Sequence, residues 1–377
     1  MNKFLFFICF FFLVFSLSAC TKKEDTSFVP SLQGKVSYTD KDATKAFDSF
    51  ILNLKDPSRN LFYRDTDKPE KLGAIWTQAI YWDMIMNAYK RTGKAEYLQL
   101  MEDVYQGGYT EYAGYDWTNH VEWFIWDDMM WWIIAMGRAY EVTGEQKYLD
   151  HAVAGFSHVW SGSYDAVNGG MDWAWTQEGK TSCINYPTVI GAMTLFNITK
   201  DSVYLDKAEK IYAWANKNLF DASNGRVADS KVGSNQPDWS LHTYNQATCI
   251  GGAVMLYLAT KEQHYLDDAV LTADYTKNVM SDTDGILPFE TGEEQGVYNA
   301  ILAQYMIRLI EDCNKPDYLP WLRKNINTAW GNRDVTRCLT TKNYKISCPT
   351  DQAISCYDAC SLVALMQVCS PDSVSTN

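Results

Sequence analysis

The sequence has few histidines and lacks the short motifs that mark metal, nucleotide and serine-nucleophile sites. Its five histidines are scattered and form no His-Glu-x-x-His pair, which favours core or surface roles over metal ligation. No glycine-rich phosphate loop and no Gly-x-Ser-x-Gly elbow occurs. We therefore expect neither a metal nor a cofactor. The five histidines are His120, His151, His158, His242 and His264.

Basic residues are outnumbered by acidic ones. Lys and Arg total 33 against 46 Asp and Glu, which gives a net charge of -13. Such a surface repels a phosphate backbone, and no basic stripe with interleaved aromatic residues is present. The composition therefore argues against nucleic-acid binding. The 14% aromatic content, with 14 Trp and 24 Tyr, would suit binding of neutral sugars.

The ten cysteines include no Cys-x-x-Cys pair. Cys9 falls in the N-terminal apolar run, and Cys20 follows that run. Buried thiols are the favoured interpretation of the other eight cysteines. An oxidising compartment would permit a disulfide among the five nearest the C-terminus, with a connectivity that spacing does not give.

The N-terminus resembles an export signal. Lys3 precedes an apolar run from Phe4 to Leu17, which is short for a membrane span and typical of a signal peptide. The run is followed by Ser18-Ala19-Cys20, so that residues 17–20 resemble a bacterial lipobox. The resemblance implies a lipoprotein signal peptide at residues 1–19, a lipid anchor on Cys20 and a polar tether at residues 20–38. We expect the protein in the bacterial cell envelope, anchored to the outer membrane on its periplasmic or surface face; an ordinary signal peptide is the alternative.

The rest of the chain contains an internal repeat. Five copies of the dipeptide Tyr-Leu recur at intervals of 51 to 61 residues, and each of these copies opens a helical pattern. A more apolar helical pattern precedes each copy. With further helices at 39–54 and 353–368, the sequence predicts an all-α fold, an (α/α)6 barrel of six helical hairpins in which an inner ring of helices lies within an outer one. We assign residues 39–370 to this domain. The five copies begin at Tyr97, Tyr148, Tyr204, Tyr265 and Tyr318.

Position within the repeat predicts which residues meet. Asp127 lies 21 residues before Tyr148, near the start of an inner helix. Equivalent positions in the other copies should gather at the same rim of the barrel, where loop tryptophans would join them to form an aromatic cleft. The equivalent positions are Trp76, Cys183, Tyr244 and Val297, and the loop tryptophans are Trp117, Trp173, Trp175 and Trp239.

Two adjacent acids, Asp127 and Asp128, follow Trp126 at this rim. Burying a charged carboxylate costs several kcal/mol of hydration, so a role in packing alone is disfavoured for this pair. Paired carboxyls beside flat aromatic surfaces suit cleavage of a glycosidic bond, and adjacency favours the short separation of a retaining enzyme. By contrast, Asp267-Asp268 follows a Tyr-Leu copy, as single acids do elsewhere, and is assigned a structural role.

The run Trp126-Asp127-Asp128-Met129-Met130-Trp131-Trp132, together with Asn168-Gly169-Gly170 and Thr243-Tyr244-Asn245-Gln246, closely resembles glycoside hydrolase family 76, the endo-α-1,6-mannanases. The resemblance covers roughly residues 40–370. It implies an (α/α)6 barrel and retaining cleavage of α-1,6-mannan, with Asp127 as nucleophile and Asp128 as acid/base. We expect a monomer that binds an α-mannan oligo- or polysaccharide. The expected sugar-binding residues are Trp117, Trp126, Trp173, Trp175, Asn185, Tyr244, Asn245 and Gln246.

Two alternatives stay open. A non-catalytic, glycan-binding surface lipoprotein would need the aromatic residues but not the acid pair. Another (α/α)6 enzyme, such as an unsaturated uronyl hydrolase or a sugar epimerase, should have basic residues or a histidine pair at the rim, and neither gathers there in the sequence.

Overall fold

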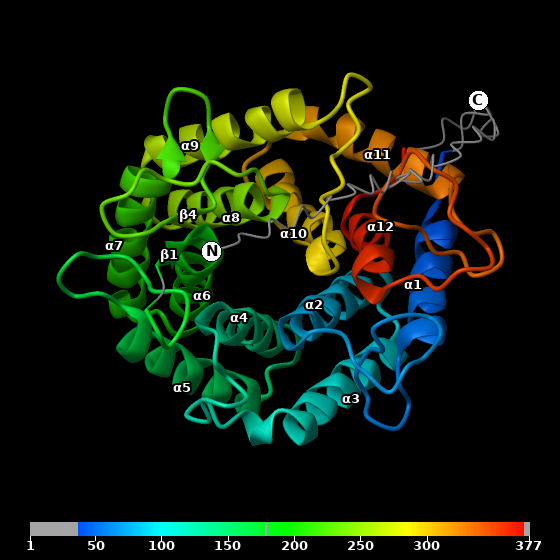
Figure 1. Ribbon diagram of the computed structural model, residues 1–377, viewed down its shortest axis with the longest axis horizontal. Helices are drawn as coiled ribbons and strands as arrows, with labels where there is room; N and C mark the ends of the chain where they lie inside the picture. The colour runs from blue at the N-terminus through cyan, green and yellow to red at the C-terminus, as the bar shows by residue number, and fades with distance from the viewer. Residues whose placement is uncertain (1–36, 178, 373–377) are drawn as a thin grey trace, which may run out of the picture. The chain divides into compact units, whose positions relative to one another are not determined.

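The computed structural model describes residues 37–177 and 179–372. Within these residues, twelve α-helices alternate between an inner and an outer ring (Figure 1). The predicted (α/α)6 barrel is thus confirmed. The inner helices are α2 (Ile75–Thr92), α4 (Trp126–Thr143), α6 (Ser182–Thr199), α8 (Thr243–Thr260), α10 (Tyr298–Asp312) and α12 (Cys356–Val368). The outer helices are α1 (Asp40–Leu54), α3 (Ala95–Glu111), α5 (Gln146–Ser163), α7 (Ser202–Leu219), α9 (Gln263–Tyr275) and α11 (Leu319–Gly331).

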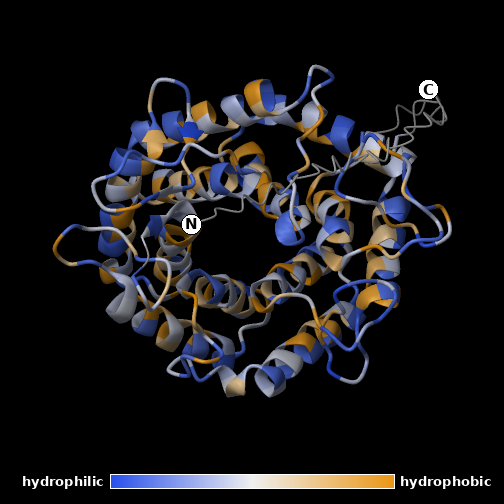
Figure 2. Cartoon of the chain, viewed as in Figure 1, coloured by the Kyte–Doolittle hydropathy of each residue, from blue (hydrophilic) through white to orange (hydrophobic). Residues whose placement is uncertain are grey.

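The inner ring is closed by its last helix. Each inner helix packs on the next, from α2 through α10 to α12, and α12 packs back on α2. Helix α1 packs on α12, so the two ends of the described chain form the sixth pair, as predicted. Closure buries the inner helices almost all round: every residue of α6 from 182 to 195 is buried, and so is every residue of α8 from 243 to 256. The outer helices carry both hydrophilic and hydrophobic residues (Figure 2).

Each of four inner helices ends in the same local arrangement. A threonine hydroxyl donates to the carbonyl four residues earlier and accepts from the backbone N–H two residues later. The residue after the threonine has a left-handed backbone, which ends the helix and reverses the chain into the outer helix. The four pairs are Thr92-Gly93, Thr143-Gly144, Thr199-Lys200 and Thr260-Lys261.

In three of the five copies, the tyrosine of the repeated Tyr-Leu pair forms a hydrogen bond to a neighbouring outer helix. Tyr97 donates to Asp48 at 2.6 Å and Tyr148 donates to Glu102 at 2.8 Å. Tyr318, just before α11, donates to Asp274 of α9 at 2.8 Å. These tyrosines therefore form hydrogen bonds between consecutive hairpins. Asp268 is structural in a similar way, because it accepts from Tyr212 of α7 at 2.8 Å.

Side-chain hydrogen bonds support the start of α6. Helix α6 starts at Ser182 although Pro187 lies inside it. Pro187 cannot donate the backbone bond to the Cys183 carbonyl, but Ser182 donates to the Ala228 carbonyl at 2.5 Å and Asn185 donates to the Thr181 carbonyl at 2.8 Å. These side-chain bonds hold the first turn that the proline weakens.

The eight cysteines of the described residues are free thiols, and all except Cys313 are buried. This agrees with the interpretation of these cysteines as core residues. No helix among the described residues is long and apolar enough to cross a membrane. The predicted signal peptide, Cys20 and all of the tether before residue 37 lie outside the described residues.

A buried ion pair links two inner helices below the rim. Arg138 of α4 contacts Asp83 of α2 and donates to Asn87 at 2.9 Å. Burial lowers the pKa of Arg138 to about 10, which shows how strongly the site disfavours a charge without a partner. Asp83 therefore belongs to the packing of the first inner helix.

We expect Asp83→Asn to lower the free energy of unfolding by about 3 kcal/mol, because it leaves the Arg138 charge buried without a counter-ion. Chemical denaturation measures the change. The control is Asp312→Asn, which breaks an exposed pair with Arg308 within one helix and should change stability by about 0.5 kcal/mol or less. Equal effects of the two substitutions would contradict a special role for the buried pair.

Candidate active site

A cavity of about 510 Å³ opens at the end of the barrel where the inner helices begin. Four of the five positions that the repeat placed at this rim line it, namely Trp76, Asp127, Cys183 and Tyr244. The fifth, Val297, is buried, and its neighbour Tyr298 lines the cavity. The other lining residues are Ala74, Ile75, Ile125, Asp128, Trp131, Trp173, Thr181, Asp229 and Glu294.

Asp127 and Asp128 occupy the first turn of α4, after Ile125, whose side chain cannot cap the helix. The positive end of the helix dipole favours negative charge there. Asp127 is only 9% exposed, and its Oδ1 has no hydrogen-bond partner among the described residues. One oxygen of this carboxyl is therefore buried without a partner among these residues, which raises the cost of ionising it.

The two carboxyl groups differ in their surroundings. Burial raises the pKa of Asp127 to about 7, and the nearby Cys183 thiol, the backbone N–H groups of the first turn and the Trp173 indole oppose the rise. Burial, the charge of Asp127 and the charge of Glu294 raise the pKa of Asp128 well above its ordinary value. Asp128 therefore holds its proton more firmly, and Asp127 ionises first.

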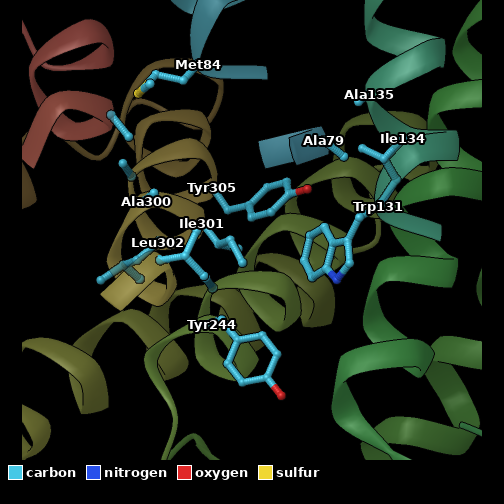
Figure 3. Close-up of a cluster of buried hydrophobic side chains, with 14 of the residues drawn as sticks. Ala79, Met84, Trp131, Ile134, Ala135, Tyr244, Ala300, Ile301, Leu302 and Tyr305 are labelled. Carbon is cyan, nitrogen blue, oxygen red and sulfur yellow. The ribbon is translucent and has the colours of Figure 1, made fainter. Parts of the chain in front are cut away.

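The walls and floor of the cavity are aromatic. Tyr244 and Tyr298 stack with ring centroids 4.0 Å apart, and the ring centroids of Trp76 and Trp131 are 6.2 Å apart. The Trp76 indole N–H donates to Glu294 at 2.8 Å. Figure 3 shows Trp131 and Tyr244 beside the apolar side chains that fill the barrel interior. The cavity thus offers flat apolar faces above a packed core, with carboxylates at its edge.

The loop at 164–181 brings Trp173 to the cavity. Asn168, Gly169 and Gly170 wrap around the indole of Trp214, which donates to the Asn168 carbonyl at 3.0 Å. Gly169 and Gly170 both have left-handed backbones, at φ 74° and 76°, and a Cβ at either would lie within 2.7 Å of Trp214. The Asn-Gly-Gly motif is therefore explained by this close approach.

Of the residues predicted to bind sugar, Trp173 and Tyr244 line the cavity. The three buried amides at its border hold loops in place. Asn185 bonds to both backbone groups of Met171. Gln246 accepts from Val227 N–H at 2.6 Å and donates to the Gly225 carbonyl. Asn245 donates to the carboxylate of Asp229 at 3.1 Å.

The other three predicted tryptophans do not line the cavity. Trp126 stacks on Trp175 with centroids 4.3 Å apart and packs against Gly162 of α5. Trp117 stacks on Tyr115, also against α5. Successive helix residues point about 100° apart, so the residue before Asp127 faces the outer ring.

Sequence reasoning missed two carboxylates, Asp229 and Glu294. Asp229 lies between β3 (Arg226–Val227) and β4 (Ser230–Lys231), and Glu294 opens the 3-10 helix η3 (Glu294–Val297). Strand β4 pairs with β1 (Lys180–Thr181), while β3 pairs with β2 (Phe220–Asp221). Neither acid occupies a repeated position of the Tyr-Leu pattern. Glu294 nevertheless lies just before an inner helix, and this location could have predicted that it reaches the rim.

The described chain resembles known proteins in sequence and in structure. The family model of glycosyl hydrolase family 76 matches residues 39–370. The structure is similar to that of the GH76A α-1,6-mannanase from Salegentibacter sp. HEL1_6, with 27% identity over 87% of this chain and 98% of that chain and a TM-score of 0.80. A search of curated proteins finds no match.

Two further structures extend the comparison. An inactive variant of the Salegentibacter enzyme, with asparagine at two consecutive aspartates, is in complex with α-1,6-mannotriose; it has 27% identity over 87% of this chain and 98% of that chain, with a TM-score of 0.80. The Lin0763 protein of Listeria innocua has 25% identity over 87% of this chain and 96% of that chain, with a TM-score of 0.78.

The acid pair should destabilise the fold at neutral pH. Because burial raises both pKa values, the pair favours folding below the unfolded-state pKa of about 4, and this contribution is lost as the pH rises through the folded-state values. Asp127→Asn/Asp128→Asn should therefore unfold at a higher temperature than the wild type at pH 8, by about 2 to 4 kcal/mol in stability, and differ little at pH 4. Calorimetry at both pH values measures this.

Asp238→Asn is the control for this measurement. Hydrogen bonds from the backbone and side chain of Ser240 lower the pKa of Asp238, so its replacement should lower stability at pH 8, the opposite sign. A stabilisation by the double variant that is the same at pH 4 and pH 8 would contradict the raised pKa values.

Proposed function

The chain belongs to glycosyl hydrolase family 76, and from this membership and its cavity we propose that it is an endo-acting, retaining hydrolase of α-1,6-mannosidic bonds in mannan backbones. The observation that carries the proposal is the buried, unequal acid pair facing an aromatic cavity. The Salegentibacter relative supports the choice of sugar, because its variant without two consecutive aspartates is inactive and is in complex with α-1,6-mannotriose.

The proposed reaction uses the two carboxyls in turn. Asp127 attacks the anomeric carbon, and the leaving glycosidic oxygen takes the proton of Asp128. Asp128 then removes a proton from water, which attacks the same carbon and releases Asp127 from the covalent intermediate. Each half-reaction inverts the anomeric carbon, so the product keeps the configuration of the substrate. The unequal pKa values match these starting states.

The lining of the cavity favours a neutral sugar. Its charged lining residues are Asp127, Asp128, Asp229 and Glu294, and it includes no lysine or arginine. An anionic uronyl sugar would meet these carboxylates without a counter-charge, which disfavours the uronyl hydrolase alternative. The acid pair disfavours a binding protein without activity, since four carboxylates are not needed to stack sugars.

We also propose that Cys20 carries the lipid anchor, that the protein is anchored to the outer membrane on its periplasmic or surface face, and that it is a monomer. The support for the anchor is the lipobox resemblance of residues 17–20. Labelling of cells with a fatty-acid probe tests it: wild type should be labelled and Cys20→Ser should not. Light scattering of residues 37–372 tests the monomer.

The two aspartates should differ in the reactions that their variants retain. Asp127→Ala should lose about 10⁴-fold or more in kcat on α-1,6-mannan and on an activated aryl α-1,6-mannobioside, since both need the nucleophile. Asp128→Ala should lose about 10²- to 10⁴-fold on mannan, with a smaller loss of the first step on the aryl substrate, whose leaving group needs no proton. Burst kinetics of aryl release measures this step.

NMR of the first product tests the stereochemistry of the wild type. An α-anomer at early times supports retention, and a β-anomer would contradict the roles given to the two aspartates. Equal losses of aryl release in both single variants would contradict their separate roles as nucleophile and acid/base.

The charge of Glu294 should set the alkaline limb of activity. Because this charge raises the pKa of Asp128, Glu294→Gln should let Asp128 lose its proton at lower pH, and the alkaline limb of kcat/KM should move down in pH. The glutamine can still accept from Trp76. The control is Glu293→Gln at the neighbouring acid, whose side chain is 64% exposed; an equal shift in both variants would contradict the assignment.

A further inference from the structure

Asp229 is fixed at the cavity by its backbone. Its N–H donates to the Asp238 carbonyl at 2.7 Å, and its carbonyl accepts from Ser182 N–H at 2.7 Å. Both bonds join the β3–β4 turn to neighbouring segments, one to the rest of the same loop and one to the start of α6. The carboxylate is therefore presented to the cavity from an anchored turn.

Asp229 and Asp127 border the same part of the cavity. Both line it, and burial together with the charges of these two aspartates raises the pKa of the Cys183 thiol. Cys183 is also the thiol near the Asp127 carboxylate. A sugar ring positioned over Asp127 would therefore have Asp229 as a neighbour.

A chain of polar groups stands behind Asp229. Asn245 donates to its Oδ1 at 3.1 Å, and Nε2 of His242 lies 3.8 Å from the same oxygen. Nδ1 of His242 contacts Glu290, which also accepts from the backbone N–H of Thr243 at 2.7 Å and from its hydroxyl at 3.1 Å. Glu290 thus fixes the start of α8 and the imidazole together.

His242 and Asn245 favour the ionised form of Asp229, whereas its burial opposes that form. Burial lowers the pKa of His242, but the hydrogen bond to Glu290 and the charges of Glu290, Asp229 and Asp238 outweigh burial and raise it. Burial raises the pKa of Asp229, as do the charges of Asp238 and Glu290, and His242 and Asn245 oppose the rise. A protonated imidazole can donate from Nδ1 to Glu290, and its charge lies at ion-pair distance from Asp229.

Asn245 and His242 approach only one of the two carboxylate oxygens of Asp229. Asn245 and His242 both face Oδ1, and in the described part of the chain no hydrogen bond reaches Oδ2. The side chain is 30% exposed, so Oδ2 can meet a ligand in the cavity. Sugar hydroxyls are donors, and a carboxylate is a strong acceptor for them.

We propose that Asp229 binds a hydroxyl of the mannosyl unit positioned over Asp127, and that His242, Glu290 and Asn245 are positioning residues that hold its carboxylate. The inference rests on the proposed function and adds which side chain binds the substrate. Asp229 then determines specificity, because a site built to bond a hydroxyl discriminates strongly against an analogue without it.

The test separates sugar binding from catalysis. Hydrolysis of α-1,6-mannan by the wild type decides the proposed function. Calorimetric binding of α-1,6-mannotriose to Asp127→Asn/Asp128→Asn decides the role of Asp229. Adding Asp229→Asn to this background should raise Kd by roughly 10- to 100-fold, the value of hydrogen bonds to a charged group. Asparagine keeps an acceptor for Asn245, so the protein should stay folded and its thermal midpoint should not fall.

Asp238→Asn is the matched control, because it makes the same change in the same loop at an exposed residue outside the cavity lining. Its Kd should stay within about twofold of the background. A Kd for the Asp229→Asn protein equal to that of this control, in a folded protein, would overturn the proposal even if the wild type cleaves mannan.

Deoxygenated ligands identify the contact. The penalty of Asp229→Asn should vanish for one of the 2-deoxy, 3-deoxy and 4-deoxy analogues of the bound unit and persist for the others. The same penalty with every analogue would overturn the proposal, because a general disturbance of the cavity does not distinguish one hydroxyl from another.

A double-mutant cycle tests the positioning residues. His242→Gln should weaken binding by about 3- to 10-fold when Asp229 is present and have little further effect in Asp229→Asn, because it acts through the carboxylate. Losses that multiply in the combined variant would overturn the positioning role of His242.

Discussion

Two carboxyl groups buried side by side cannot both ionise without compensation, and the structure compensates only one of them. Asp127 has the first-turn N–H groups of α4, the Cys183 thiol and the Trp173 indole nearby, whereas Asp128 faces the charges of Asp127 and Glu294. The inequality comes from groups on four different parts of the chain, namely α4, the loop that carries Trp173, α6 and η3. The barrel and its loops are therefore needed to give the two acids different protonation states, as acid/base chemistry requires.

The closed inner ring stabilises the protein enough to tolerate the two buried carboxyl groups. The helix starts meet at one rim because each hairpin pairs an inner helix with an outer one, and four inner helices end in the same threonine-led turn. The core below the rim is packed by apolar side chains such as Ile301 and Tyr305 (Figure 3). A rigid, well-packed scaffold can hold buried carboxyls that lower its stability, which is the usual trade-off at a catalytic site.

Much of the fold and part of the site could be predicted from the sequence. The repeat gave the hairpins and the height of each residue along the barrel axis, so Trp76, Asp127, Cys183 and Tyr244 were brought to one rim. Spacing says less about direction around a helix and nothing about loops outside the repeat. For this reason Trp126 was predicted at the cavity although it faces α5, and Asp229 was not predicted at all.

The motif Tyr244-Asn245-Gln246 shows how one short run can serve three purposes. Consecutive helix residues point about 100° apart, so Tyr244 faces the cavity while its two neighbours face the loop beside it. Gln246 bonds the backbone of the segment before Asp229, and Asn245 bonds the Asp229 carboxylate itself. Two residues of a motif that suggested direct sugar contact therefore hold a third side chain at the cavity. The presence of so much support for one loop carboxylate is explained if that carboxylate, rather than the amides, meets the sugar.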